Sequence, residues 1–124
     1  MGIEVLETEW SRYKYCVLEH SQNHYQEIRQ LLQNKDSYPA LKMYQIIEAS
    51  FNLQVVPGNR INAAQHVWGY FKDKASEAED LRFHRLLQKF SAEESGIQPV
   101  KNHLLRLAEK YQEDYLLNGY YFYI

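Results

Sequence analysis

Between residues 59 and 74, apolar and polar positions recur with the period of an α-helix. The apolar positions fall three or four residues apart and would form one face: Ile61, Ala64, Trp68 and Phe71. A second face at the same spacing is polar and includes a glycine: Asn62, His66, Gly69 and Asp73. Glycine in a helix interior costs about 1 kcal/mol relative to alanine. Gly69 therefore indicates that another backbone, a side chain or a ligand comes close to the Asn62/His66 face.

The same periodicity predicts two helices before this one. The first is a single long helix from Thr8, which can cap it, to about Gln33. The second is capped by Ser37 and has Pro39 in its first turn, where a missing N–H does no harm. One side of this second helix is apolar and is expected to face inward: Leu41, Tyr44, Ile47 and Phe51.

Capping signals define the rest of the chain. Asn59 is expected to cap the helix with the two faces, and Ser76 with Glu79 forms a capping box for a fourth helix that ends near Gly96. The buried face of that helix is predicted to be Phe83, Leu86, Leu87 and Phe90. A fifth helix follows Pro99, with these residues facing inward: Val100, Leu104, Leu107, Ala108, Tyr111 and Tyr115.

These patterns predict an all-α fold. A chain of 124 residues is long enough for one domain with a real core, and short connections favour antiparallel packing of neighbouring helices. We therefore expect residues 1–124 to form a single-domain compact bundle of about five helices.

Polar residues interrupt the apolar side of the first predicted helix. Ser21 and His24 project between Val17 and Ile28, and His20 lies at the edge. A buried imidazole or hydroxyl without a partner costs on the order of a few kcal/mol. The Asn62/His66 face and His103, at the edge of the fifth helix's inner side, are candidate partners. Two interpretations stay open, a satisfied core histidine or a polar pocket that several helices share.

Composition excludes several classes of protein. The net charge of -2 gives no global attraction to nucleic acid or anionic membranes, and Cys16, the single cysteine, excludes an intrachain disulfide. The chain has no run of about 18 apolar residues that could cross a membrane. The acidic N-terminus is not a secretory signal, so a cytoplasmic location is expected. His20 and His24 are four residues apart but have no obvious third ligand, so we expect no metal and no cofactor.

Two motifs resemble a known family. The segment from His20 to Tyr25, and Asn62 followed by His66, Gly69 and Tyr70, resemble the YbgA-like family, a bacterial domain of unknown function. Where many relatives have a histidine two residues before the motif asparagine, this chain has Arg60. Some relatives are fused to a domain associated with desulfuration of thiolated uracil, which implies a link to nucleobase or RNA metabolism. With this resemblance, the candidate ligand-binding residues are His20, Ser21, His24, Tyr25, Asn62, His66, Gly69, Tyr70 and His103.

Three classes of function fit these observations. The first is a binding module for a nucleobase, a nucleotide or an RNA-related ligand, since the eleven tyrosines offer rings for stacking and Asn62 can read a base edge. The second is a small enzyme that uses the same histidines as acid or base, or with a metal. The third is an assembly role for the aromatic C-terminal segment. Gly119 is expected to adopt the left-handed conformation and fold residues 120–124 back onto their own domain or across a homodimer axis.

Overall fold

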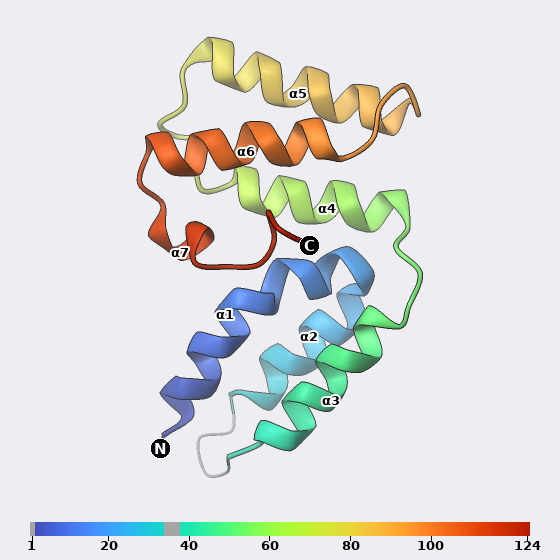
Figure 1. Cartoon of the computed structure of the whole chain (residues 1–124), viewed down its shortest axis with the longest axis vertical. Coiled ribbons are helices and arrows are strands. Elements are labelled where there is room, and N and C mark those ends of the chain that lie inside the picture. The colour runs from blue at the N-terminus through green and yellow to red at the C-terminus, as the bar shows by residue number, and fades with distance from the viewer. Residues whose placement is uncertain (1, 34–37) are drawn as a thin grey trace.

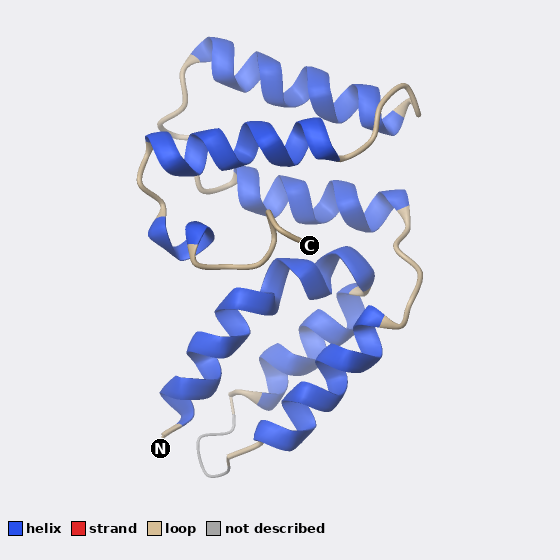
Figure 2. Ribbon diagram, in the orientation of Figure 1, coloured by secondary structure: helices blue, strands red, loops and turns tan. Residues whose placement is uncertain are grey.

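The regular secondary structure is entirely helical. The computed structural model describes residues 2–33 and 38–124, and within these ranges it contains seven helices and no strand (Figure 2). The helices are α1 (Ile3–His20), α2 (Gln22–Leu31), α3 (Ala40–Phe51), α4 (Pro57–Trp68), α5 (Glu77–Ser91), α6 (Gln98–Lys110) and α7 (Asp114–Leu117). The all-α prediction is confirmed, but the number of helices is seven rather than about five. No helix in the described part of the chain has the length and apolar character needed to cross a membrane.

The helices form two groups that meet at α1 and α4. Helices α1, α2 and α3 pack on one another, and α6 contacts α4, α5 and α7 (Figure 1). Helix α4 lies between the two groups and packs against α1. The C-terminal segment passes between α4 and α1 (Figure 1). The junction of the two groups is therefore built from segments far apart in the sequence.

The first long helix of the sequence prediction is wrong in both its start and its continuity. Helix α1 already begins at Ile3, and the hydroxyl of Thr8 donates to the carbonyl of Glu4 within that helix. The backbone becomes extended at Ser21, with φ −162° and ψ 113°, and α2 starts at the next residue. The Ser21 side chain accepts a hydrogen bond from the backbone N–H of His24, as an N-cap serine does. The serine thus ends one helix and caps the next.

Two expectations about α4 are also corrected. Its N-cap is Val56 with Pro57 in the first turn, so Asn59 lies inside the helix. The side-chain amide of Asn59 instead donates to the carbonyl of His20 at 3.3 Å, which satisfies a group at the end of α1. Gly69 is the C-cap of α4 and not an interior residue, and a Cβ at this position would meet only backbone atoms of Gln65 and His66 within 4 Å. No neighbouring element requires this glycine.

The ends of α5 and α6 share one geometry. Helix α5 begins with the predicted capping box of Ser76 and Glu79, which is confirmed. It ends before Gly96, at Ala92, and the residue with positive φ is Glu93 at 61°. The N–H of Glu94 bonds to the carbonyl of Lys89, the pattern of a Schellman motif. Helix α6 ends in the same way, with Gln112 at φ 55°. Two left-handed positions are therefore occupied by residues with a Cβ.

Two substitutions after α5, Glu93→Gly and Gly96→Ala, should each stabilise the protein. A Cβ in the left-handed conformation costs roughly 1–2 kcal/mol, so Glu93→Gly should raise the free energy of unfolding by about 1 kcal/mol. Gly96 has no positive φ and nothing within 4 Å of a Cβ position, so Gly96→Ala should add about 0.4–1 kcal/mol. Urea unfolding of both variants measures the two effects. A lower midpoint for Glu93→Gly would show that glutamate is not strained there.

The predicted inner faces are confirmed for some helices and wrong for others. In α5 and α6 the fully or nearly fully buried residues include Phe83, Leu87, Val100 and Leu104, as expected. Tyr115, predicted on the inner face of the fifth helix, instead lies in α7 and is 43% exposed. In α3 the buried residues are Met43, Ile46, Ile47 and Ser50, whereas Leu41 is 74% exposed and Tyr44 42% exposed. The apolar side of α3 is thus rotated relative to the predicted one. The proposed cap Ser37 lies outside the described residues.

The C-terminal segment is packed on its own chain. Tyr121 and Phe122 are buried, and the backbone N–H of Tyr120 donates to the carbonyl of Arg12 in α1 at 2.9 Å. Gly119 does not have a positive φ, so that expectation is wrong. A Cβ position at Gly119 lies 3.5 Å from the carbonyl oxygen of Arg12, so a small residue lets the segment approach α1. Homodimerisation through this segment stays a prediction that a solution mass would test.

Candidate functional site

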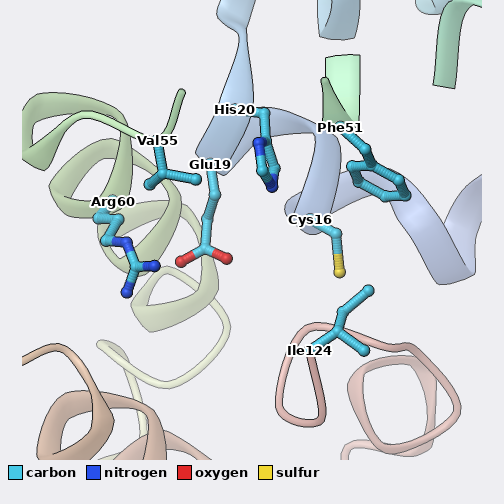
Figure 3. A pocket seen from close by; sticks show the side chains of 7 residues that line it. All are labelled: Cys16, Glu19, His20, Phe51, Val55, Arg60 and Ile124. Carbon is cyan, nitrogen blue, oxygen red and sulfur yellow. The ribbon is translucent and has the colours of Figure 1, made fainter. Parts of the chain in front are cut away.

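A cavity of about 260 Å³ opens where α1, α4 and the C-terminal segment meet. Figure 3 shows the seven side chains that line it. Helix α1 contributes three of them, and the others come from the end of α3, the α3–α4 connection, α4 and the C-terminal segment: Cys16, Glu19, His20, Phe51, Val55, Arg60 and Ile124. The cavity therefore depends on the long-range packing of the two groups of helices.

Glu19 is a buried acid with one oxygen in use. Its Oε1 accepts a hydrogen bond at 2.9 Å from Nζ of Lys101 in α6, and both side chains are about 95% buried, with exposures of 6% and 4%. Its Oε2 is buried and has no hydrogen-bond partner among the described residues. Buried polar atoms are nearly always paired. The free oxygen is thus the most unusual polar group of the cavity.

Lys101 holds the C-terminal segment as well as Glu19. Its Nζ also donates to the main-chain oxygens of Tyr121 at 3.0 Å and Ile124 at 3.2 Å, so three acceptors surround the ammonium group. The same Nζ lies 4.4 Å from the centre of the Tyr121 ring. The hydroxyl of Tyr121 is buried without a partner among the described residues, and burial, followed by the charge of Glu19, raises its pKa well above the ordinary value.

His20 has one ring nitrogen fixed and one free. Its Nδ1 lies 3.0 Å from the carbonyl oxygen of Leu53, and since a carbonyl can only accept, Nδ1 carries the proton. In the neutral ring, Nε2 is then an acceptor. The imidazole packs edge-on against Phe51, with ring centres 5.2 Å apart, and extends into the cavity (Figure 3).

Cys16 and Arg60 complete the polar lining. Burial, and then the nearby charge of Glu19, raises the pKa of the Cys16 thiol to about 12, so the sulfur stays protonated at neutral pH and is a poor nucleophile. Arg60 is half-buried, and its guanidinium is turned toward the Glu19 carboxylate (Figure 3). Among the described residues, no ion pair includes Arg60. Its guanidinium therefore has no carboxylate partner in the described part of the chain.

The structure separates the residues of the predicted shared pocket. Ser21 and His24 satisfy each other, with the Ser21 hydroxyl 2.7 Å from Nδ1 of His24. Their hydrogen bonds thus come from each other, and within the described residues neither of the two candidate partners, the Asn62/His66 face and His103, is bonded to them. His24 lines a separate hollow between α2 and α3. Tyr25 is buried and packs its ring against Trp10 and His66, with ring centres 5.7 and 6.3 Å apart.

The second motif lies along α4, away from the cavity around Glu19. Asn62, His66 and Gly69 line an open hollow of about 350 Å³ together with Gln65. His66 and Gly69 are exposed and Asn62 is half-buried. Tyr70 is part of an aromatic cluster in which its hydroxyl lies 2.7 Å from that of Tyr15. Burial, and then the Tyr70 contact, raises the pKa of Tyr15.

His103 belongs to the α5–α6 interface. It is buried, and its Nε2 donates to the carbonyl of Glu79 at 3.0 Å, which makes it a satisfied core histidine. Burial lowers its pKa from the ordinary value. The Glu79 carboxylate accepts from Lys110 and Tyr111, and these bonds lower its pKa to about 2. Of the nine candidate residues, His20 alone lines the cavity around Glu19.

Glu19, which lines the cavity, and its buried partner Lys101 were not predicted from the sequence. Lys101 shares a helical face with Leu104 and Ala108, so its inward position could have been inferred from spacing. Glu19 follows a run of four buried residues in α1, which is a weaker signal. Within the described parts of the chain, no three histidine, cysteine or acidic side chains are grouped in a way that could hold a metal ion.

The comparison with protein families identifies the family to which the chain belongs. The model of the DUF1722 family, described as a protein of unknown function, matches residues 14–124. The chain belongs to this family. The resemblance to YbgA-like domains is thereby confirmed, since both names denote the same family. No curated protein and no solved structure matches the chain. This DUF1722 domain carries every residue of the cavity within the matched range.

Proposed function

We propose that this DUF1722 domain is a binding module for a small nitrogen heterocycle of the nucleobase class, and that the cavity around Glu19 is its site. The observation that carries the proposal is the buried Oε2 of Glu19, which has no partner among the described residues and belongs to a side chain that lines the cavity. An unpaired buried charge-bearing oxygen is costly, and a ligand N–H would satisfy it with a charge-assisted hydrogen bond.

The size and lining of the cavity favour a small, flat ligand. Drug-sized ligands occupy pockets of roughly 300–1,000 Å³, and the volume here, about 260 Å³, is just below that range. Phe51 and Val55 give apolar contacts, while Glu19, His20 and Arg60 are the convergent polar groups. Relatives fused to a domain associated with desulfuration of thiolated uracil point to the same ligand class.

Binding, rather than catalysis, is the function that the side chains support best. The protonated Cys16 thiol is no nucleophile at neutral pH, and Oε1 of Glu19 is held by Lys101. His20 has a free Nε2 that would serve equally well as a hydrogen-bond acceptor for a ligand. The residues of the second motif, Asn62 and His66, line an open surface hollow instead of an enclosed site.

Calorimetric titration with free uracil, cytosine, adenine and hypoxanthine tests the proposal. We expect at least one base to bind at neutral pH, and Glu19→Gln to weaken it by about tenfold or more, because a hydrogen bond to a charged group is worth about 1.5–3 kcal/mol. The control is Glu48→Gln on the exposed side of α3, which should leave binding unchanged.

A second variant keeps the proposal testable if Glu19→Gln fails to fold. His20→Gln changes a half-buried residue that also lines the cavity and should weaken the same ligand. Chromatography of the recovered ligand separates binding from catalysis. The proposal is overturned if no base binds, if both variants bind as well as the wild type, or if the base is recovered chemically changed.

A further inference from the structure

The two unpaired groups of the cavity have opposite hydrogen-bonding character. A carboxylate oxygen only accepts and a guanidinium only donates. The carboxylate of Glu19 comes from α1 and the guanidinium of Arg60 from α4, and the guanidinium is turned toward that carboxylate in the lining of the cavity (Figure 3). The ion pair of Glu19 is with Lys101 and not with Arg60. A ligand that bridges Glu19 and Arg60 must therefore offer a donor to the first and an acceptor to the second.

The charges around the cavity favour a neutral ligand. A cation placed against Glu19 would also meet the positive charges of Lys101 and Arg60. An anion placed against Arg60 would meet the carboxylate of Glu19. Like charges brought together away from water are strongly unfavourable. A neutral, dipolar edge with a donor beside an acceptor avoids both repulsions.

Resting on the proposed function, we infer that Glu19 and Arg60 together recognise a lactam edge, the adjacent N–H and C=O of a heterocycle such as uracil or hypoxanthine. The ring N–H donates to Oε2 of Glu19, and the carbonyl oxygen accepts from Arg60. A carbonyl oxygen has two lone pairs and can accept two guanidinium N–H groups, whereas a ring nitrogen has one. This difference sets lactam bases apart from adenine, which has no carbonyl and presents a ring nitrogen beside an amino group.

His20 and Phe51 determine how the ring of such a ligand lies. The fixed tautomer of His20 leaves Nε2 as a further acceptor on the cavity side. The edge-on packing of His20 against Phe51 keeps the imidazole in place, so the acceptor does not have to be ordered when the ligand binds. A second ring N–H, as in uracil, would have a partner here.

The direct test compares compounds that differ only at the lactam edge. Calorimetry at neutral pH with 2-pyridone, N-methyl-2-pyridone and 2-aminopyridine isolates the N–H and the carbonyl without the rest of a base. We expect 2-pyridone to bind and each of the other two to bind about tenfold more weakly or worse. N-methylation removes the donor to Glu19, and the ring nitrogen of 2-aminopyridine can accept only one guanidinium N–H of Arg60. Uracil and hypoxanthine should likewise bind more tightly than adenine, which lacks a carbonyl.

Variants of Arg60 separate the two proposals. Arg60→Met keeps most of the length of the side chain and removes the donors, so it should weaken uracil and 2-pyridone by about tenfold and abolish their advantage over 2-aminopyridine. Arg85→Met, an exposed position on α5, is the control and should change nothing. If adenine binds as tightly as uracil, and Arg60→Met has no effect, the lactam inference fails while nucleobase binding stands. If no base and no pyridone binds, both proposals fail and the free oxygen of Glu19 is merely hydrated.

Discussion

Replacement of Lys101 by alanine is expected to lower the free energy of unfolding by about 3–5 kcal/mol. The change leaves the buried carboxylate of Glu19 without its cation and removes the donor of the main-chain oxygens of Tyr121 and Ile124. Breaking one side of a buried ion pair is costly because the remaining charge is uncompensated. Urea unfolding followed by circular dichroism measures the loss.

Two comparisons test whether the loss of stability in Lys101→Ala arises from the burial of the Glu19–Lys101 ion pair. Lys74→Ala breaks an ion pair of 2.7 Å with Glu113 in which the lysine side chain is 41% exposed, and should cost less than about 1 kcal/mol. The double variant Lys101→Met/Glu19→Met removes both charges and should recover most of the loss. Equal losses for Lys101→Ala and Lys74→Ala would contradict the burial of the Glu19–Lys101 pair.

Tyr121→Ala should have an effect of similar size, about 3–5 kcal/mol, through the loss of a buried ring. Tyr121 is 2% exposed and packs edge-on against Tyr15 and Phe122, so alanine leaves a cavity between α1 and the C-terminal segment. The segment should then detach from α1, and the backbone N–H of Tyr120 should exchange faster with solvent. Thermal unfolding and amide exchange measure the two consequences.

The phenylalanine variant at the same position separates packing from hydrogen bonding. The hydroxyl of Tyr121 is buried and has no partner among the described residues. Since an unpaired buried hydroxyl gives no stability, Tyr121→Phe should leave the free energy of unfolding unchanged or raise it by up to about 1–3 kcal/mol. A loss of more than about 1 kcal/mol would instead show that the hydroxyl has a partner in solution.

Helices could be located from the sequence wherever the apolar spacing is interrupted by a clear cap. The capping box at Ser76 and the inner face of α6 were predictable for this reason. The break at Ser21 was not, because Val17 and Ile28 are eleven residues apart, which is close to three helical turns. The apolar period thus continues through the break, and only the preference of serine for N-cap positions marks it.

The candidate site was less predictable than the helices. The motif residues His24 and Asn62 each line a hollow, but the two hollows are different ones. Spacing along one helix can show that Lys101 faces inward, yet it does not identify an acid on another helix as its partner. Glu19 and Arg60 acquire their roles only when α1 packs against α4, which is tertiary information.

The separation of Glu19 and Lys101 along the chain has a consequence for the order of folding. Their hydrogen bond joins residues 82 positions apart, and the bond from Tyr120 to Arg12 spans nearly the whole chain. Closing such loops costs more chain entropy than forming the local helix pairs, so these contacts are expected to form last. In a chain still emerging from the ribosome, α1, α2 and α3 would therefore pack together before Lys101 has been synthesised, and Glu19 would not yet have its ion-pair partner. The cavity around Glu19 would therefore be completed only after α6 has been synthesised and the aromatic residues Tyr121 and Phe122 have packed against the rest of the chain.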